Sequence, residues 1–89
     1  MQADLASLAS RQIAQRLMYP EEAIARGLEG EVLVLLFLDA DGNSVAARLE
    51  RSSGHAILDD AAVAAARQVN AMPEGEPREV LLPVRFRLQ

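Results

Sequence analysis

Residues 80–88 read Val80-Leu81-Leu82-Pro83-Val84-Arg85-Phe86-Arg87-Leu88. Apolar side chains recur at every second position, and valine and phenylalanine favour extended backbone, so this segment is predicted to be a β-strand. Pro83 conflicts with a central place in a sheet, because proline has no N–H to donate. The strand is therefore expected at a sheet edge or at a bulge. An edge strand has unpaired backbone groups, which promote aggregation or capture an extended peptide.

Two further strands are expected earlier in the chain, joined by a hairpin. Residues 31–38 include seven consecutive apolar residues, which predicts a strand that is apolar on both faces. One face would lie under helices, and the other under the N-terminal helix or a partner. Asp41-Gly42 is a hairpin signal. Apolar and polar residues then alternate over residues 45–50, which predicts a half-buried strand antiparallel to the first.

Three helices are expected from apolar spacing and from helix boundaries. Residues 3–17 have helical spacing of leucine and isoleucine, and the sequence leaves open whether this helix packs on the domain or extends from it as a stalk. Pro20 is expected to begin a short second helix that ends at Gly27. Residues 57–69 predict a third helix, whose alanines allow a close approach to the sheet. Residues 70–78, with two prolines and a glycine, are expected to form a loop.

The predicted order is helix, helix, strand, strand, helix, strand. This order indicates an α+β fold in which helices cover one face of a three-stranded antiparallel sheet. With 89 residues, the chain is expected to form one domain with a small core. Within it, residues 1–18 are expected to be an N-terminal helix or the end of a spacer, and residues 19–89 the folded domain.

Composition excludes several classes of function. The net charge is −4, and the nine basic residues are all arginines spread along the chain, which argues against a nucleic-acid groove. The longest apolar run is far shorter than the roughly 20 residues of a membrane helix. There is no cysteine, so disulfide and thiolate chemistry are unavailable, although this does not identify a compartment. The residues after Met1 are polar and acidic, so any export signal or anchor is expected outside this chain.

One polar cluster has the residue types of a hydrolase, with a nucleophile, a base and carboxylates close together. It lies at a strand-to-helix junction, where serine and aspartate are common caps, and it lacks a glycine-bracketed nucleophile elbow. A single histidine also cannot form a multi-histidine metal site. We therefore expect a structural role, and no enzyme activity or cofactor, for Ser52, Ser53, His55, Asp59 and Asp60.

Two acidic residues near the hairpin, Asp39 and Asp41, invite comparison with a calcium loop. The run is too short to supply the bidentate glutamate and the fuller ligand set of such a loop. We therefore interpret it as a hairpin turn.

Set in order, the segments of residues 19–88 resemble the C-terminal domain of the TonB family of energy transducers. The match includes Tyr19-Pro20-x-x-Ala23, Gly27-x-x-Gly30-x-Val32-x-Val34, Phe37-x-Asp39, Gly42-x-x-Val45 and the ending Pro83-Val84-x-Phe86-x-Leu88. The most specific stretch is Ser52-Ser53-Gly54-His55 followed by Leu58-Asp59-x-Ala61-Ala62. Two features depart from the family. Met72 stands before Pro73 where an aromatic residue is common, and Glu21 and Glu22 follow Tyr-Pro where a basic residue is common.

The resemblance implies a periplasmic domain, tethered to the inner membrane by a segment outside this chain, that works with ExbB- and ExbD-like motor proteins in transport such as siderophore uptake. It implies docking of the TonB box, a peptide of an outer-membrane transporter, as a strand beside the last strand. The implied peptide-binding residues are Val80, Leu81, Leu82, Pro83, Val84, Arg85, Phe86, Arg87 and Leu88, bordered by Tyr19 and Pro20.

Other interpretations of these residues stay open. The last strand could be an ordinary core strand with a bulge at Pro83, and Tyr19 could start a helix with its ring packed on the core. Arg85 and Arg87 could form a solvated face or contact acidic residues of a transporter. A TolA-like envelope interaction domain is one alternative function. A self-associating module, with a homodimer formed through the same edge, is another.

Overall fold

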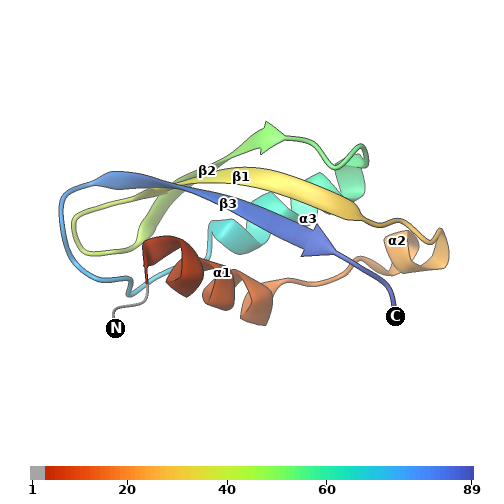
Figure 1. The fold of residues 1–89 in the computed structure, drawn as a ribbon, viewed down its shortest axis with the longest axis horizontal. Coiled ribbons are helices and arrows are strands. Elements are labelled where there is room, and N and C mark those ends of the chain that lie inside the picture. Colours follow the sequence, from red (N-terminus) through yellow and green to blue (C-terminus); the bar gives the residue numbers. More distant parts are fainter. Residues whose placement is uncertain (1–3) are drawn as a thin grey trace.

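The computed structural model describes residues 4–89 and has the predicted α+β order (Figure 1). Its elements are α1 (Leu5–Arg16), α2 (Glu21–Ala25), β1 (Gly30–Leu38), β2 (Ser44–Arg51), α3 (Ala56–Ala66) and β3 (Arg78–Phe86). Ala3, the predicted first residue of α1, lies outside the described residues. Pro20 is the residue before α2 rather than its first helical residue, a difference of one position that is usual at helix ends.

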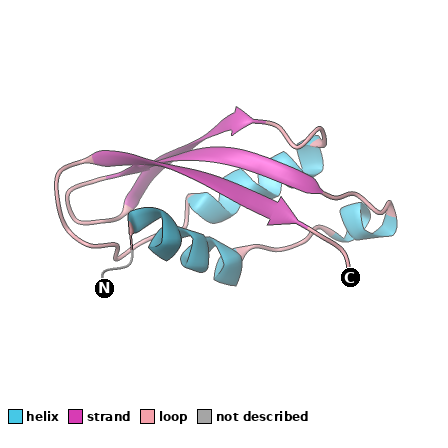
Figure 2. Cartoon of the chain, viewed as in Figure 1, coloured by secondary structure: helices cyan, strands magenta, loops and turns pink. Residues whose placement is uncertain are grey.

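The three strands form one antiparallel sheet in the order β2-β1-β3 (Figure 2). β3 is thus an edge strand, as Pro83 predicts. Pro83 lies opposite Leu33 in a ladder without a register shift, whereas the β1–β2 ladder has two irregularities. The edge position, rather than a bulge, accommodates the proline. β3 starts and ends two residues earlier than expected, so Arg87 and Leu88 follow the strand.

Every second side chain of β1 and β3 points to the helices and is buried. α1 packs along β3, and α3 packs under β1 and β2 on the same face (Figure 1). α1 contributes the buried Ala9 and Ile13, so the N-terminal helix docks on the sheet instead of extending as a stalk. The strands contribute Val32, Val34, Leu36, Leu38, Val80, Leu82, Val84 and Phe86 to this core.

The opposite face of the sheet has no helix over it within residues 4–89. Leu33, Leu35 and Phe37 of β1 point to this face and are partly exposed, and Leu81 of β3 is 52% exposed. β1 is therefore apolar on both faces, as its sequence predicts, but only one face is covered by helices.

The prediction of a half-buried β2 is wrong. Val45 is 65% exposed and Leu49 is 41% exposed, and Ala47 is only partly buried. α3 contacts β2 as well as β1. A hollow lined by Ala47 and Leu49 of β2 and by Asp59, Asp60 and Val63 of α3 lies between the two elements, so the helix covers the side chains of β2 only in part.

The predicted loop at residues 70–78 is fixed against the β1–β2 hairpin. The Met72 N–H donates to the Gly42 carbonyl (2.8 Å), and the Ser44 N–H donates to the Val69 carbonyl (2.9 Å). Gly42 has φ +85°, and a Cβ built on it would lie 1.9 Å from the Met72 carbonyl oxygen. The hairpin therefore requires glycine at this position.

α1 is held to the same segment by one side chain. The Gln12 Nε2 donates to the Asn70 carbonyl (2.6 Å), and the Gln12 Oε1 accepts from the Asn70 N–H (3.0 Å). The side-chain amide thus bonds to both backbone groups of one residue, as the backbone of a paired β-strand does. It fixes the position of α1 along the sheet.

Candidate functional site

The candidate site is the edge of β3 that faces away from β1. No strand pairs with this edge in the part of the chain that the structure describes. Because proline is tolerated where its nitrogen faces away from the ladder, we expect the nitrogen of Pro83 at the open edge. Backbone groups point the same way at every second residue, which predicts that Leu81 and Arg85 also have their N–H and carbonyl groups there.

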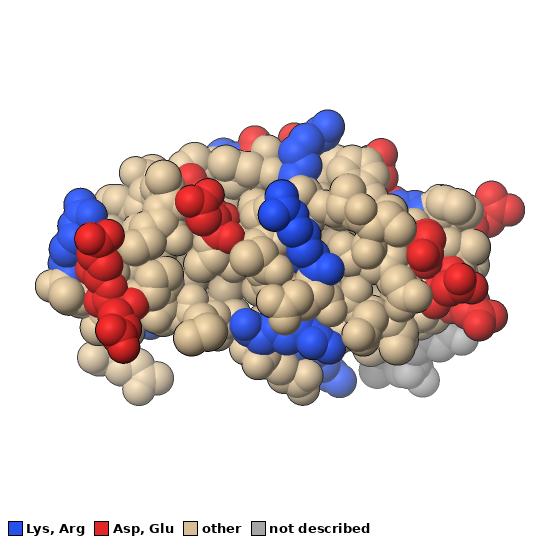
Figure 3. All heavy atoms as spheres, turned by 180° about the vertical axis from the view of Figure 1, so that it is seen from behind, with Lys and Arg blue, Asp and Glu red and all other residues tan. Residues whose placement is uncertain are grey.

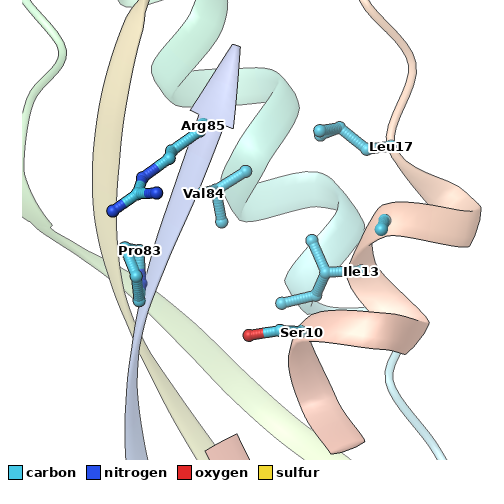
Figure 4. Close-up of a pocket in the computed structure, with 7 residues that line it drawn as sticks. Ser10, Ile13, Leu17, Pro83, Val84 and Arg85 are labelled. Carbon is cyan, nitrogen blue, oxygen red and sulfur yellow. The ribbon is translucent and has the colours of Figure 1, made fainter. Parts of the chain in front are cut away.

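A groove of about 310 Å³ runs between this edge and α1 (Figure 4). Ile13 and Val84 form its apolar base and are only 3% and 4% exposed. Figure 4 shows Val84 pointing toward α1, whereas the Arg85 side chain points away from the helix. The full lining is Ser10, Ile13 and Ala14 of α1, Leu17 just after this helix, and Pro83, Val84 and Arg85 of β3.

Arg85 is engaged on the outer face of the sheet. Its Nε lies 2.6 Å from Oε2 of Glu31, its partner residue in the β1–β3 register. This hydrogen bond holds the pKa of Glu31 below its usual value, against an opposing effect of partial burial. The Arg85 side chain stays 64% exposed, and the Glu31 carboxylate balances its charge.

Charge is distributed rather than concentrated on the face seen from behind. Figure 3 shows arginine and acidic side chains interspersed there with uncharged surface. This pattern differs from the continuous basic patch of a nucleic-acid-binding face.

Tyr19 lies next to the end of β3 and does not line the groove. Its ring meets the ring of Phe86 edge-on, with centroids 5.2 Å apart and an interplanar angle of 81°. Its hydroxyl donates to the Leu28 carbonyl. Partial burial raises the pKa of Tyr19, and the nearby Glu29 carboxylate raises it further. The ring therefore packs on the core, and a role in peptide binding stays a prediction.

We expect Tyr19→Ala to destabilise the domain more than Tyr19→Phe. The alanine variant loses both the edge contact with Phe86 and the hydroxyl bond to Leu28, whereas the phenylalanine variant loses only the bond. Urea unfolding of both variants measures the two losses. Equal stability of Tyr19→Ala and the parent domain would contradict the packing role.

The end of β3 borders a second hollow. Arg87 and Leu88, predicted as strand residues, line it together with Glu29, Gly30, Glu31, Arg85 and Phe86. The Leu88 N–H donates to Oε2 of Glu29 (2.6 Å), which holds the chain after β3 against the segment before β1.

The serine, histidine and aspartate cluster forms a structural junction. The buried Asp59 accepts hydrogen bonds from the Ser53 N–H (2.8 Å), the Ser53 Oγ (2.8 Å) and the Ser52 Oγ. Burial alone would raise the pKa of Asp59, but these bonds outweigh it and lower the pKa. His55 precedes α3 without a side-chain capping bond, and Asp60 is exposed. Within residues 4–89, no group of three His, Cys, Asp or Glu side chains is placed to hold a metal.

The α1 wall of the groove was missed by sequence reasoning. The spacing of Leu5, Leu8, Ile13 and Leu17 identifies the side of the helix that packs on the core, but not the strand against which it packs. Ser10 and Ala14, which face the groove, have no distinctive pattern. No helix of residues 4–89 combines the length and hydrophobicity needed to cross a membrane.

The sequence of this chain matches a known protein family. A family model described as "Gram-negative bacterial TonB protein C-terminal" matches residues 15–88. Protein TonB of Vibrio cholerae is 37% identical over 91 residues, which covers 97% of this chain and 36% of the relative. Protein TonB of Pasteurella multocida is 37% identical over 81 residues, which covers 88% of this chain and 32% of the relative. The chain thus spans about a third of the length of these curated relatives.

Solved structures have the same fold. Two NMR solution structures of Helicobacter pylori TonB-CTD superpose with TM-scores of 0.80 and 0.72, at 29% and 28% identity. The first match covers 99% of this chain and 85% of the other, and the second covers 96% and 95%. The chain therefore belongs to the family of TonB C-terminal domains, whose members are interaction domains rather than enzymes.

Proposed function

We propose that this chain is the periplasmic domain of a TonB-like energy transducer. It binds the TonB box of an outer-membrane transporter as an added strand beside β3. The observation that carries this proposal is the unpaired β3 edge beside an apolar groove. Extended peptides bind sheet edges of this kind through backbone hydrogen bonds.

The remaining parts of the proposal concern partners outside this chain. A segment outside this chain anchors the domain in the inner membrane, where ExbB- and ExbD-like motor proteins supply force. The domain transmits that force to the transporter and so supports uptake of substrates such as siderophores. Family membership supports this assignment.

The number of backbone hydrogen bonds determines the expected affinity of the domain for the peptide. Leu81 and Arg85 can each exchange two hydrogen bonds with a guest strand and Pro83 can accept one, about five in all. At a net value of about 1 kcal/mol each, with some side-chain burial, they must offset several kcal/mol of association and ordering cost. The expected dissociation constant is near micromolar, which corresponds to a binding free energy of about −8 kcal/mol. Binding of this affinity is reversible.

A titration of the isotope-labelled domain tests the docking site. A TonB-box peptide is expected to shift the backbone amide resonances of residues 79–86 more than those of β2. If the β3 amides stay unperturbed at millimolar peptide, the site is wrong.

Leu81→Pro is expected to weaken peptide binding about fivefold, because it removes one edge donor worth about 1 kcal/mol. Leu81→Ala is the matched control, since it shortens the same exposed side chain and keeps the N–H. Its affinity is expected to stay close to that of the parent domain. Isothermal titration calorimetry measures both, after a spectrum shows that each variant is folded. Equal affinities for the two variants would exclude Leu81 from the ladder.

Self-association is a second candidate function, favoured by the same open edge and by the exposed apolar face around Leu35 and Phe37. Two copies could pair through β3, and the peptide would then compete with the homodimer. Light scattering over a wide concentration range tests this. A monomer at high micromolar concentration would exclude it.

A further inference from the structure

We infer that the groove between α1 and β3 selects guest peptides by the pattern of their side chains. Every second residue of the guest, the set that faces α1, must be apolar and small to medium in size. The residues between them are free to vary. This inference rests on the proposed function of the β3 edge and adds a specificity rule to it.

The alternation follows from strand geometry. A guest strand beside β3 lies about 4.8 Å from it, and its successive side chains point to opposite faces of the sheet. Val84 marks the face that points to α1, and Pro83 and Arg85 mark the other. Guest residues on the Val84 side therefore lie over the groove. Those on the other side lie beside Pro83 and Arg85.

The groove has the chemistry of an apolar subsite. Ser10 and Ala14 are one helical turn apart, so their small side chains leave room on the same face of α1. Ile13, Leu17 and Val84 supply apolar surface. Arg85 is the only charged residue of the lining, and it is paired with Glu31 on the outer face. A guest carboxylate in the groove would lose water without gaining a partner, which is costly.

The wall formed by α1 is fixed before a guest arrives. Ala9 and Ile13 anchor the helix in the core, and Gln12 fastens it to Asn70. A rigid wall reduces the ordering cost of binding and keeps the width of the groove constant. Width and polarity together discriminate against large or charged side chains at alternate positions.

An aspartate scan of the TonB-box peptide tests the alternation. Each residue is replaced by aspartate in turn, and the affinity for the parent domain is measured. We expect losses of about tenfold or more at alternate positions, where the carboxylate enters the groove, and small changes between them. Losses that show no two-residue period would overturn the inference.

Ala14→Trp tests the same groove from the side of the domain. The indole fills the space beside Val84, and we expect binding to weaken about tenfold or more. Ala64→Trp is the matched control, because Ala64 is also an exposed helical alanine and lies on α3, away from the groove. It is expected to bind like the parent. If Ala14→Trp fails to fold, Ser10→Leu narrows the groove with a smaller side chain.

The outcomes separate the two proposals. If the peptide shifts the β3 amides but the folded groove variants bind like the parent, the groove rule is wrong and strand addition stands. If the peptide does not bind the parent domain, strand addition fails and the groove rule fails with it.

Discussion

Replacing Gly42 with alanine is expected to lower the free energy of unfolding by about 3–5 kcal/mol, a large part of the total stability of a small domain. Two effects add. Gly42 has φ +85°, which costs an L-residue energy, and the new methyl group would overlap the Met72 carbonyl oxygen at 1.9 Å. Relief of this overlap separates the hairpin from the Met72 segment and breaks the Met72 N–H bond to Gly42.

Gly27→Ala is the matched control. Gly27 also has positive φ, +67°, but nothing lies within 4 Å of an added Cβ. We expect a loss of only about 1 kcal/mol there, from backbone strain alone. Urea unfolding of both variants gives the difference, which measures the contact with Met72. Similar losses in the two variants would show that the hairpin and the Met72 segment separate easily.

Asp59→Ala is the second large effect, with an expected loss of about 3 kcal/mol. The substitution leaves the Ser53 N–H and the hydroxyls of Ser52 and Ser53 without their acceptor at the β2–α3 junction. Unpaired polar groups at a buried site cost far more than the net value of the bonds they made. Asp60→Ala, at the exposed neighbouring position, is expected to change stability by less than about 0.5 kcal/mol.

The same carboxylate predicts a dependence on pH. The pKa of Asp59 is lowered in the folded state, so its charged form stabilises the fold at a pH above the ordinary aspartate value. That stability is lost as the pH falls from about 5 through the lowered pKa. Asp59→Asn is expected to flatten this acid loss in thermal melts recorded between neutral and acid pH. An unchanged acid profile in Asp59→Asn would contradict the role of the charge.

Local chemistry was enough to predict the elements that determine the fold. Proline cannot donate a backbone bond, so Pro83 indicated either an edge position or a bulge for β3, and the structure has the edge position. A run of seven apolar residues indicated a strand with two apolar faces, and it became the central strand. The motif order from Tyr19 to Leu88 indicated the TonB family, which the family model confirms over residues 15–88.

Features that depend on distant contacts were not predictable in the same way. Alternation in β2 suggests a buried face, but burial depends on how closely α3 packs against it, and a hollow lies between α3 and the side chains of Ala47 and Leu49. The segment around Met72 looks like a free loop until Gly42 brings the hairpin against it. The groove requires α1 and β3 to meet, and more than 60 residues separate Ala14 from Val84.

The parallel course of α1 and β3 along the long axis has a mechanical consequence (Figure 1). Hydrogen bonds between β3 and a guest strand would lie across that axis. If the domain and the guest were pulled apart along this axis, these bonds would be loaded together in shear, instead of breaking one after another from an end. A guest held by only a few backbone bonds would then be expected to withstand a brief pull.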